Sequence, residues 1–204
     1  MILIGQCASP FTRRVAIALQ CYAITYRYEL WSAFADIEKI APFNPVIRVP
    51  TLVLDNGEAL IESAAILDYL DDLVGPERAM LAPTGEERYR VLRICALAMS
   101  LCEKLVSGIY ECRNHETASD AWLDRCESQV RNILGVLEGE RSARTTPFWF
   151  GDRLSHADVA VTCAMTFLAR ANPNIVEHRT WPALAGHAGY CEQLTPFRAT
   201  APVF

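Results

Sequence analysis

The stretch that decides the fold of this chain begins with Ile2-Leu-Ile-Gly5, continues through Ser9-Pro-Phe-Thr-Arg-Arg-Val-Ala-Ile-Ala-Leu19 and ends with Thr25-Tyr-Arg-Tyr-Glu-Leu30. The apolar run before Gly5 indicates a short buried strand. Ser9 followed by Pro10 is typical of a helix N-cap and first helical residue, so we expect a helix to about Tyr22. The alternating β-forming residues after it predict a second strand. Strand, helix and strand in so short a segment form a βαβ unit with two parallel strands.

The following residues complete a small α/β domain. Residues 31–48 are expected to be irregular, and Asn56-Gly57 between two apolar runs favours a tight hairpin turn. A helix is expected from about Glu62 to Val74. The domain, residues 1–75, therefore has the order β-α-β-β-β-α.

The rest of the chain has almost no strand signal. Residues 76–84 are expected to form a linker, and residues 85–204 an all-helical domain. Thr84-Gly-Glu-Glu87 and Ser155-His-Ala-Asp158 are typical of capping boxes that begin helices. The expected fold is an α/β domain followed by an all-α helical bundle.

Composition excludes several classes of function. The 204 residues are 51% hydrophobic and carry a formal net charge of −5, so no basic surplus exists to bind nucleic acid. No uncharged apolar run approaches the about 20 residues that a membrane span needs. The N-terminal residues lack the features of a signal peptide, so we expect a cytoplasmic protein.

The eight cysteines do not predict a disulfide framework or a metal site. There is no C-x-x-C motif, and no Cys/His pair has zinc-ligand spacing. Most of the cysteines are expected to be small reduced core residues. Cys7 is the exception, because it lies two residues before Ser9.

Three features stand at junctions of the first domain: Ser9 at the start of a helix, Val49-Pro50 before the third strand, and Glu62-Ser63 at the start of the next helix. Helix N-termini offer free N–H groups and partial positive charge, so they favour anions. A proline before a strand, if cis, turns backbone groups toward a ligand. Together these features suit an extended, peptide-like anion.

The same residues resemble a known family. Ser9–Leu19, Val49-Pro-Thr-Leu52, Glu62-Ser63 and Gly151–Asp158 are similar, in this order, to motifs of cytosolic glutathione S-transferases. The resemblance covers nearly the whole chain and implies a thioredoxin-like N-terminal domain with a helical C-terminal domain. It also implies a homodimer that uses glutathione as co-substrate and attaches its thiol to small electrophilic, apolar molecules in detoxification.

The resemblance also implies a role for each residue that binds glutathione. Val49-Pro50 would be cis, with the Val49 backbone pairing with the cysteinyl part of the tripeptide. Glu62 would hold the γ-glutamyl ammonium, and Ser63 the γ-glutamyl carboxylate. Arg48 would reach the glycyl carboxylate.

By the same resemblance, Ser9 is the catalytic residue. A free thiol has a pKa near 8.5, and a hydroxyl at a helix N-terminus that donates to the sulfur favours the thiolate. Phe11 would lie beside the thiol, in both the glutathione site and the substrate pocket. That pocket is expected between the domains. Its other side would be formed by Ser107, Tyr110 and Arg113, on a long helix expected from about Thr84 to Arg113.

Other hypotheses remain open at this point. Ser9 is also simply a good helix cap. Cys7 would support a glutathione-dependent thiol transferase or reductase. Isomerase or dehalogenase chemistry would use the same site, and a non-catalytic member of the fold would bind a protein partner or serve regulation.

Overall fold

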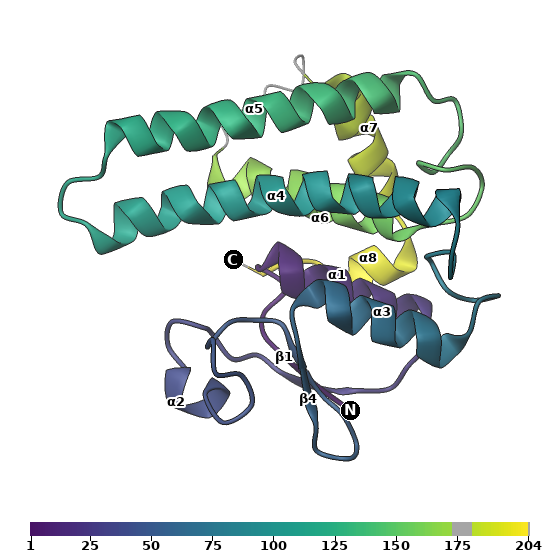
Figure 1. The fold of residues 1–204 in the computed structure, drawn as a ribbon, viewed down its shortest axis with the longest axis horizontal. Helices are drawn as coiled ribbons and strands as arrows, with labels where there is room; N and C mark the ends of the chain where they lie inside the picture. Colours follow the sequence, from purple (N-terminus) through teal and green to yellow (C-terminus); the bar gives the residue numbers. More distant parts are fainter. Residues whose placement is uncertain (173–180, 204) are drawn as a thin grey trace. The chain divides into compact units, whose positions relative to one another are not determined.

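The computed structural model describes residues 1–172 and 181–203, which belong to two compact units (Figure 1). The first unit comprises Met1–Pro83 together with Gln193–Phe204, and the second comprises Thr84–Glu192. The chain passes from one unit to the other at the end of the expected linker. None of the helices in the described residues has the length and apolar composition of a membrane span.

The first unit is built on a four-stranded mixed sheet. The strands are β1 (Ile2–Ile4), β2 (Arg27–Glu29), β3 (Thr51–Val53) and β4 (Ala59–Ile61), and the helices are α1 (Pro10–Cys21), α2 (Ile37–Ile40) and α3 (Ser63–Val74). The strand order is β2-β1-β3-β4, with β1 parallel to β2 and β3 antiparallel to both β1 and β4. Helix α1 connects β1 to β2, as the βαβ pattern predicts, and the turn at Asn56-Gly57 joins β3 to β4.

The two faces of this sheet are covered differently, because successive strand residues point to opposite sides. Leu3 and Leu52 are paired neighbours on one face, which lies beneath α1 and α3 (Figure 1). Ile4 and Val53 lie on the other face and pack with Ile40 of α2. This single-turn helix lies within the segment that the sequence predicts to be irregular, and it ends just before Pro42.

The turn from β1 into α1 requires a glycine. Gly5 has a φ of +135°, and a Cβ atom at this position would lie 2.6 Å from Thr12 Oγ1 and 2.9 Å from Val49 Cβ. Real Cβ atoms do not approach other atoms this closely. Because Gly5 has no side chain, the first turn of α1 and the segment before β3 can approach each other closely.

The described C-terminal residues 193–203 belong to the first unit, whereas the sequence predicts them as part of the helical domain. Arg13 of α1 is 1% exposed, and its guanidinium donates to the carbonyls of Thr200 (Nε, 3.1 Å) and Phe197 (Nη2, 3.3 Å). Phe197, in α8 (Thr195–Ala199), is fully buried. A buried guanidinium needs acceptors, and the end of the chain supplies them.

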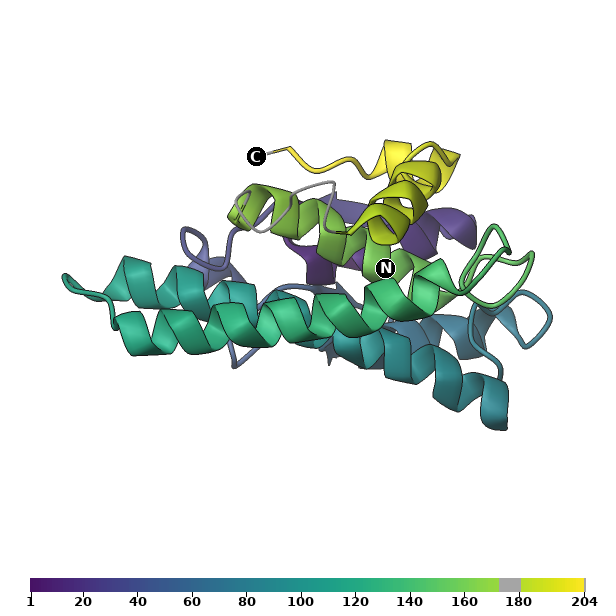
Figure 2. The ribbon, with the colours of Figure 1, turned by 90° about the horizontal axis from the view of Figure 1, so that it is seen from above.

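The second unit is helical. Its helices are α4 (Glu86–Asn114), α5 (Asp120–Ser142), α6 (His156–Ala171) and α7 (Pro182–Cys191). α4 and α5 lie side by side and antiparallel (Figure 2), and α6 packs against both α4 and α7.

One of the two predicted capping boxes forms in this unit. At the start of α6, the buried Asp158 carboxylate accepts hydrogen bonds from Ser155 N (2.8 Å) and Ser155 Oγ (2.7 Å). The box predicted at Thr84 is wrong, because Gly85 is the N-cap of α4 and carries no side chain that can cap it.

Replacing Gly5 by alanine tests the close approach. We expect Gly5→Ala to lower the free energy of unfolding by about 2–4 kcal/mol, because it adds both backbone strain and overlap with Thr12 and Val49. Gly57→Ala is the matched control, since Gly57 also has positive φ (+87°) but no neighbour within 4 Å. Gly57→Ala should lower the free energy of unfolding by about 1–2 kcal/mol, from backbone strain alone. Urea unfolding measures both, and equal losses would contradict the steric argument.

Candidate functional site

The register of the sheet brings the three sequence motifs to one edge. Ile4 pairs with Thr51, and Thr51 pairs with Ile61, so these residues form one row across three strands. The loop of Ser9 follows the first of them, Val49-Pro50 directly precedes the second, and Glu62-Ser63 directly follows the third. The antiparallel pairing of β3 with both neighbours is the reason, because the end of one strand then lies beside the start of the next.

Ser9 is the N-cap of α1, as predicted. Its backbone is extended, and its Oγ accepts a hydrogen bond from Thr12 N at 3.4 Å. Because the amide is the donor in this contact, the hydroxyl keeps its own proton for another acceptor. The half-buried hydroxyl therefore lies at the positive end of a twelve-residue helix with a donor still available.

The peptide bond between Val49 and Pro50 is cis, which confirms the prediction. The loop that carries it is held by Asn44, a buried residue that sequence reasoning missed. Asn44 Nδ2 donates to Arg48 O (2.8 Å) and Thr51 Oγ1 (3.1 Å), while its Oδ1 accepts from Val46 N (2.9 Å). The one available signal was an asparagine between two prolines, since asparagine side chains readily hydrogen-bond to nearby backbone.

Glu62 and Ser63 occupy the start of α3 with different exposure. Glu62 is the N-cap and is exposed, with a φ of +64°, a strained conformation of the kind that is common at binding sites. Ser63 is the first helical residue and is 3% exposed. Its Oγ accepts a hydrogen bond from Arg14 Nε of α1 at 3.0 Å. No role for Arg14 follows from the sequence alone.

Arg48 lies beside Glu62, with Nη1 3.6 Å from Glu62 Oε1. Both side chains are largely exposed, so the pair contributes little to stability. The structure thus brings together Arg48, Val49, Pro50, Glu62 and Ser63 through pairing within the first unit. The contact of Arg48 with a glycyl carboxylate stays a prediction.

Cys7 lies in an environment that keeps its thiol neutral. Its Sγ is 3.0 Å from Tyr28 Oη. Burial raises the pKa of the Cys7 thiol above its ordinary value, although the hydrogen bond with Tyr28 and the charge of Arg13 partly offset this. Burial also raises the pKa of Tyr28, so neither group is a ready anion at neutral pH. Thiol transfer requires a thiolate, and the Cys7 hypothesis is therefore not favoured.

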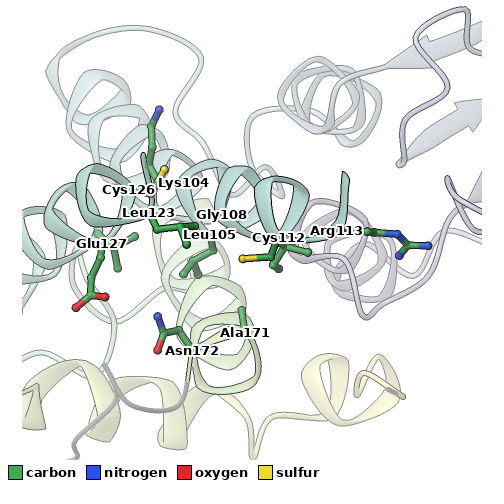
Figure 3. A pocket seen from close by; sticks show the side chains of 12 residues that line it. Lys104, Leu105, Gly108, Cys112, Arg113, Leu123, Cys126, Glu127, Ala171 and Asn172 are labelled. Atoms are coloured by element: carbon green, nitrogen blue, oxygen red, sulfur yellow. The ribbon is translucent and has the colours of Figure 1, made fainter. Parts of the chain in front are cut away.

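The helical unit contains a cavity of about 530 Å³ between α4, α5 and the end of α6 (Figure 3). Leu105, Leu123 and Val130 are among the apolar residues that line it. Arg113 is at its edge, and its guanidinium points away from the other labelled side chains in Figure 3. Ser107 and Tyr110 lie on α4 without lining this cavity. The assignment of Phe11, Ser107, Tyr110 and Arg113 to an electrophile pocket stays a prediction.

No metal centre is found in the described part of the chain. Across residues 1–172 and 181–203, no group of three or more His, Cys, Asp or Glu side chains could hold a metal ion. All eight cysteines lie in this described part of the chain, and none of them forms a disulfide bond.

The fold and this edge define a class of protein. A thioredoxin-like α/β unit carries a cis-proline loop between the N-termini of two helices, and a helical unit follows it in the chain. Two family models match: "Glutathione S-transferase, N-terminal domain" over residues 3–78, and "Glutathione S-transferase, C-terminal domain" over residues 120–190. The chain belongs to the glutathione S-transferase family.

Comparisons with individual relatives also support membership of this family. The GST-like protein YibF of Escherichia coli K12 is 32% identical over 169 residues, which cover 82% of each chain. A glutathione S-transferase of Methylobacillus flagellatus, crystallised with glutathione bound, is 26% identical with a TM-score of 0.91 over 99% of both chains. A glutathione transferase family member of Pseudomonas fluorescens, also with bound glutathione, is 28% identical with a TM-score of 0.85 over 100% of this chain and 99% of that one.

The raised pKa of Cys7 predicts how its alkylation depends on pH. Only the thiolate reacts, so a pKa above the ordinary value makes Cys7 react slowly with iodoacetamide at pH 7 and faster as the pH rises past 9. The exposed Cys112 is the internal control and should be labelled first. Mass spectrometry of the labelled peptides gives both rates. Labelling of Cys7 at pH 7 as fast as that of Cys112 would contradict the assignment of a neutral thiol.

Proposed function

We propose that this protein is a glutathione transferase that joins the glutathione thiol to small, apolar electrophiles, with Ser9 as the residue that activates the thiol. One observation carries the proposal: the row Ile4, Thr51 and Ile61 sets Ser9, the cis Val49-Pro50 loop and Glu62-Ser63 at the same edge of one sheet. Membership of the family and the glutathione bound in related structures support it.

In this proposal glutathione binds as an extended peptide along the edge of the sheet. The backbone of Val49 pairs with the cysteinyl residue. The Glu62 carboxylate binds the γ-glutamyl ammonium, and the Ser63 hydroxyl with the first N–H groups of α3 binds the γ-glutamyl carboxylate. Arg48 is expected to bind the glycyl carboxylate once the tripeptide competes for Glu62.

The chemical step begins with ionisation of the glutathione thiol. Each unit by which the site lowers the thiol pKa from about 8.5 needs about 1.4 kcal/mol of preference for the thiolate. A hydrogen bond from Ser9 Oγ–H and the N-terminus of α1 can supply this. The thiol proton leaves to solvent, the sulfur forms a bond to the electrophilic carbon, and the leaving group takes its bonding electrons. Ser9 keeps its proton and never becomes the nucleophile.

The assignment of Phe11, Ser107, Tyr110 and Arg113 to the electrophile, the homodimer, the cytoplasmic location and the role in detoxification belong to the same proposal. They rest on the family resemblance.

Calorimetric titration of glutathione tests the binding site. We expect saturable binding to the wild-type protein, weakened at least about tenfold by Glu62→Ala/Ser63→Ala, because these changes remove two charge-assisted hydrogen bonds. Glu58→Ala is the control, since it removes another exposed acid of the same unit. If the folded wild-type protein does not bind glutathione at millimolar concentration, the enzyme hypothesis is contradicted. The alternative of a non-catalytic family member that binds a protein partner would then be favoured.

Ser9→Ala separates catalysis from helix capping. We expect kcat/KM with 1-chloro-2,4-dinitrobenzene to fall about ten- to a hundredfold, while glutathione affinity changes little, because the lost bond acts on the thiolate. Ser119→Ala is a matched control: Ser119 caps α5 through the same contact, with Trp122 N at 3.3 Å. Both variants should lose about 1 kcal/mol of stability. If both keep full turnover, Ser9 is only a cap.

A further inference from the structure

Arg14 is a buried cation directly behind the start of α3. It lies in the middle of α1, is 4% exposed, and its Nε donates to Ser63 Oγ at 3.0 Å. Ser63 itself is 3% exposed and lies 49 residues further along the chain. Arginine is almost never fully buried unless its guanidinium has hydrogen-bond partners. The contact with Ser63 is therefore part of what allows Arg14 to be buried.

The direction of this hydrogen bond determines what the Ser63 hydroxyl can do. A guanidinium has only donors, so Ser63 Oγ must be the acceptor and its own proton must point elsewhere. A hydroxyl that accepts from a cation is also polarised, which strengthens the bond that it donates. At the first position of α3, that donor lies among the free N–H groups of the helix N-terminus. The arrangement suits a carboxylate.

We propose that Arg14 is a positioning residue for glutathione: it holds the Ser63 hydroxyl as a donor toward the carboxylate of the γ-glutamyl residue and makes binding selective for peptides that carry this carboxylate. The inference rests on the proposed function. In this proposal Arg14 acts on the ligand through the Ser63 hydroxyl rather than by direct contact. Removal of Arg14 therefore weakens the binding of a ligand that has a carboxylate for Ser63 more than the binding of one that lacks it.

Arg13 offers a matched comparison on the same helix. It is buried to the same degree, but its guanidinium donates to the carbonyls of Thr200 and Phe197, so it ties α1 to the C-terminal segment. Successive helix residues point about 100° apart, which sends these two guanidiniums to different neighbours. Loss of Arg13 should lower the melting temperature without changing which ligands are preferred.

The test compares two ligands by titration calorimetry. One is glutathione, and the other is 4-aminobutanoyl-cysteinyl-glycine, which lacks only the γ-glutamyl carboxylate. Arg14→Met keeps an unbranched side chain without a donor, and Arg14→Lys keeps the charge and is the second variant in case the first does not fold. We expect Arg14→Met to lower the affinity for glutathione about tenfold, and Arg14→Lys to lower it less. In both variants the affinity for the analogue should stay within about twofold of the wild-type value. Arg13→Met should leave the ratio of the two affinities unchanged.

A double-mutant cycle adds a second readout. In the Ser63→Ala background, Arg14→Lys should produce no further loss of glutathione affinity, because the two residues act as one unit. Equal losses for both ligands, or an unchanged glutathione affinity in a folded Arg14 variant, would overturn this inference alone. Absence of glutathione binding to the wild-type protein would overturn the proposed function together with it.

Discussion

The rest of the structure depends on the antiparallel pairing of β3 with both β1 and β4. This pairing places Ile4, Thr51 and Ile61 in one row, so that three loops far apart in the sequence meet at one edge. A shift of one residue in this register would exchange the faces of Leu52 and Val53, and both faces are buried. The core therefore enforces the same register that assembles the site. Gly5 and Asn44 then adjust the loops at this edge, one by leaving space and the other by hydrogen bonding.

Two adjacent buried arginines connect α1 to the rest of its unit. Arg13 binds the carbonyls of the C-terminal segment, and Arg14 binds the hydroxyl at the start of α3. Burial of a guanidinium is costly unless its donors are satisfied, so each cation requires a particular partner in a particular place. The contacts of Arg13 with Phe197 and Thr200 help to hold residues 193–203 in the first unit, although these residues follow the helical part of the chain.

Ser9 and Cys7 lie two residues apart in the sequence but have different hydrogen-bond partners in the structure. Ser9 is a helix cap whose hydroxyl accepts from Thr12 N and keeps its own proton as a donor. Cys7 is paired with Tyr28, and burial raises its pKa. The proposed function accordingly assigns the reactive sulfur to glutathione and not to Cys7. This difference between neutral and ionised sulfur is set by burial and hydrogen bonding.

The sequence by itself determined the βαβ unit, the hairpin at Asn56-Gly57, the cap at Ser9 and the helical character of the second part, because each depends on residues close together in the chain. The cis bond before Pro50 was expected from the family resemblance and not from the local pattern. Only the tertiary structure decided the partners of Arg13 and Arg14, the support that Asn44 gives to the cis-proline loop, the neutral state of Cys7 and the place of the C-terminal segment. Each of these depends on burial and on hydrogen bonds that the folded chain alone brings together. Local pattern carries no information about which distant group will satisfy a buried donor.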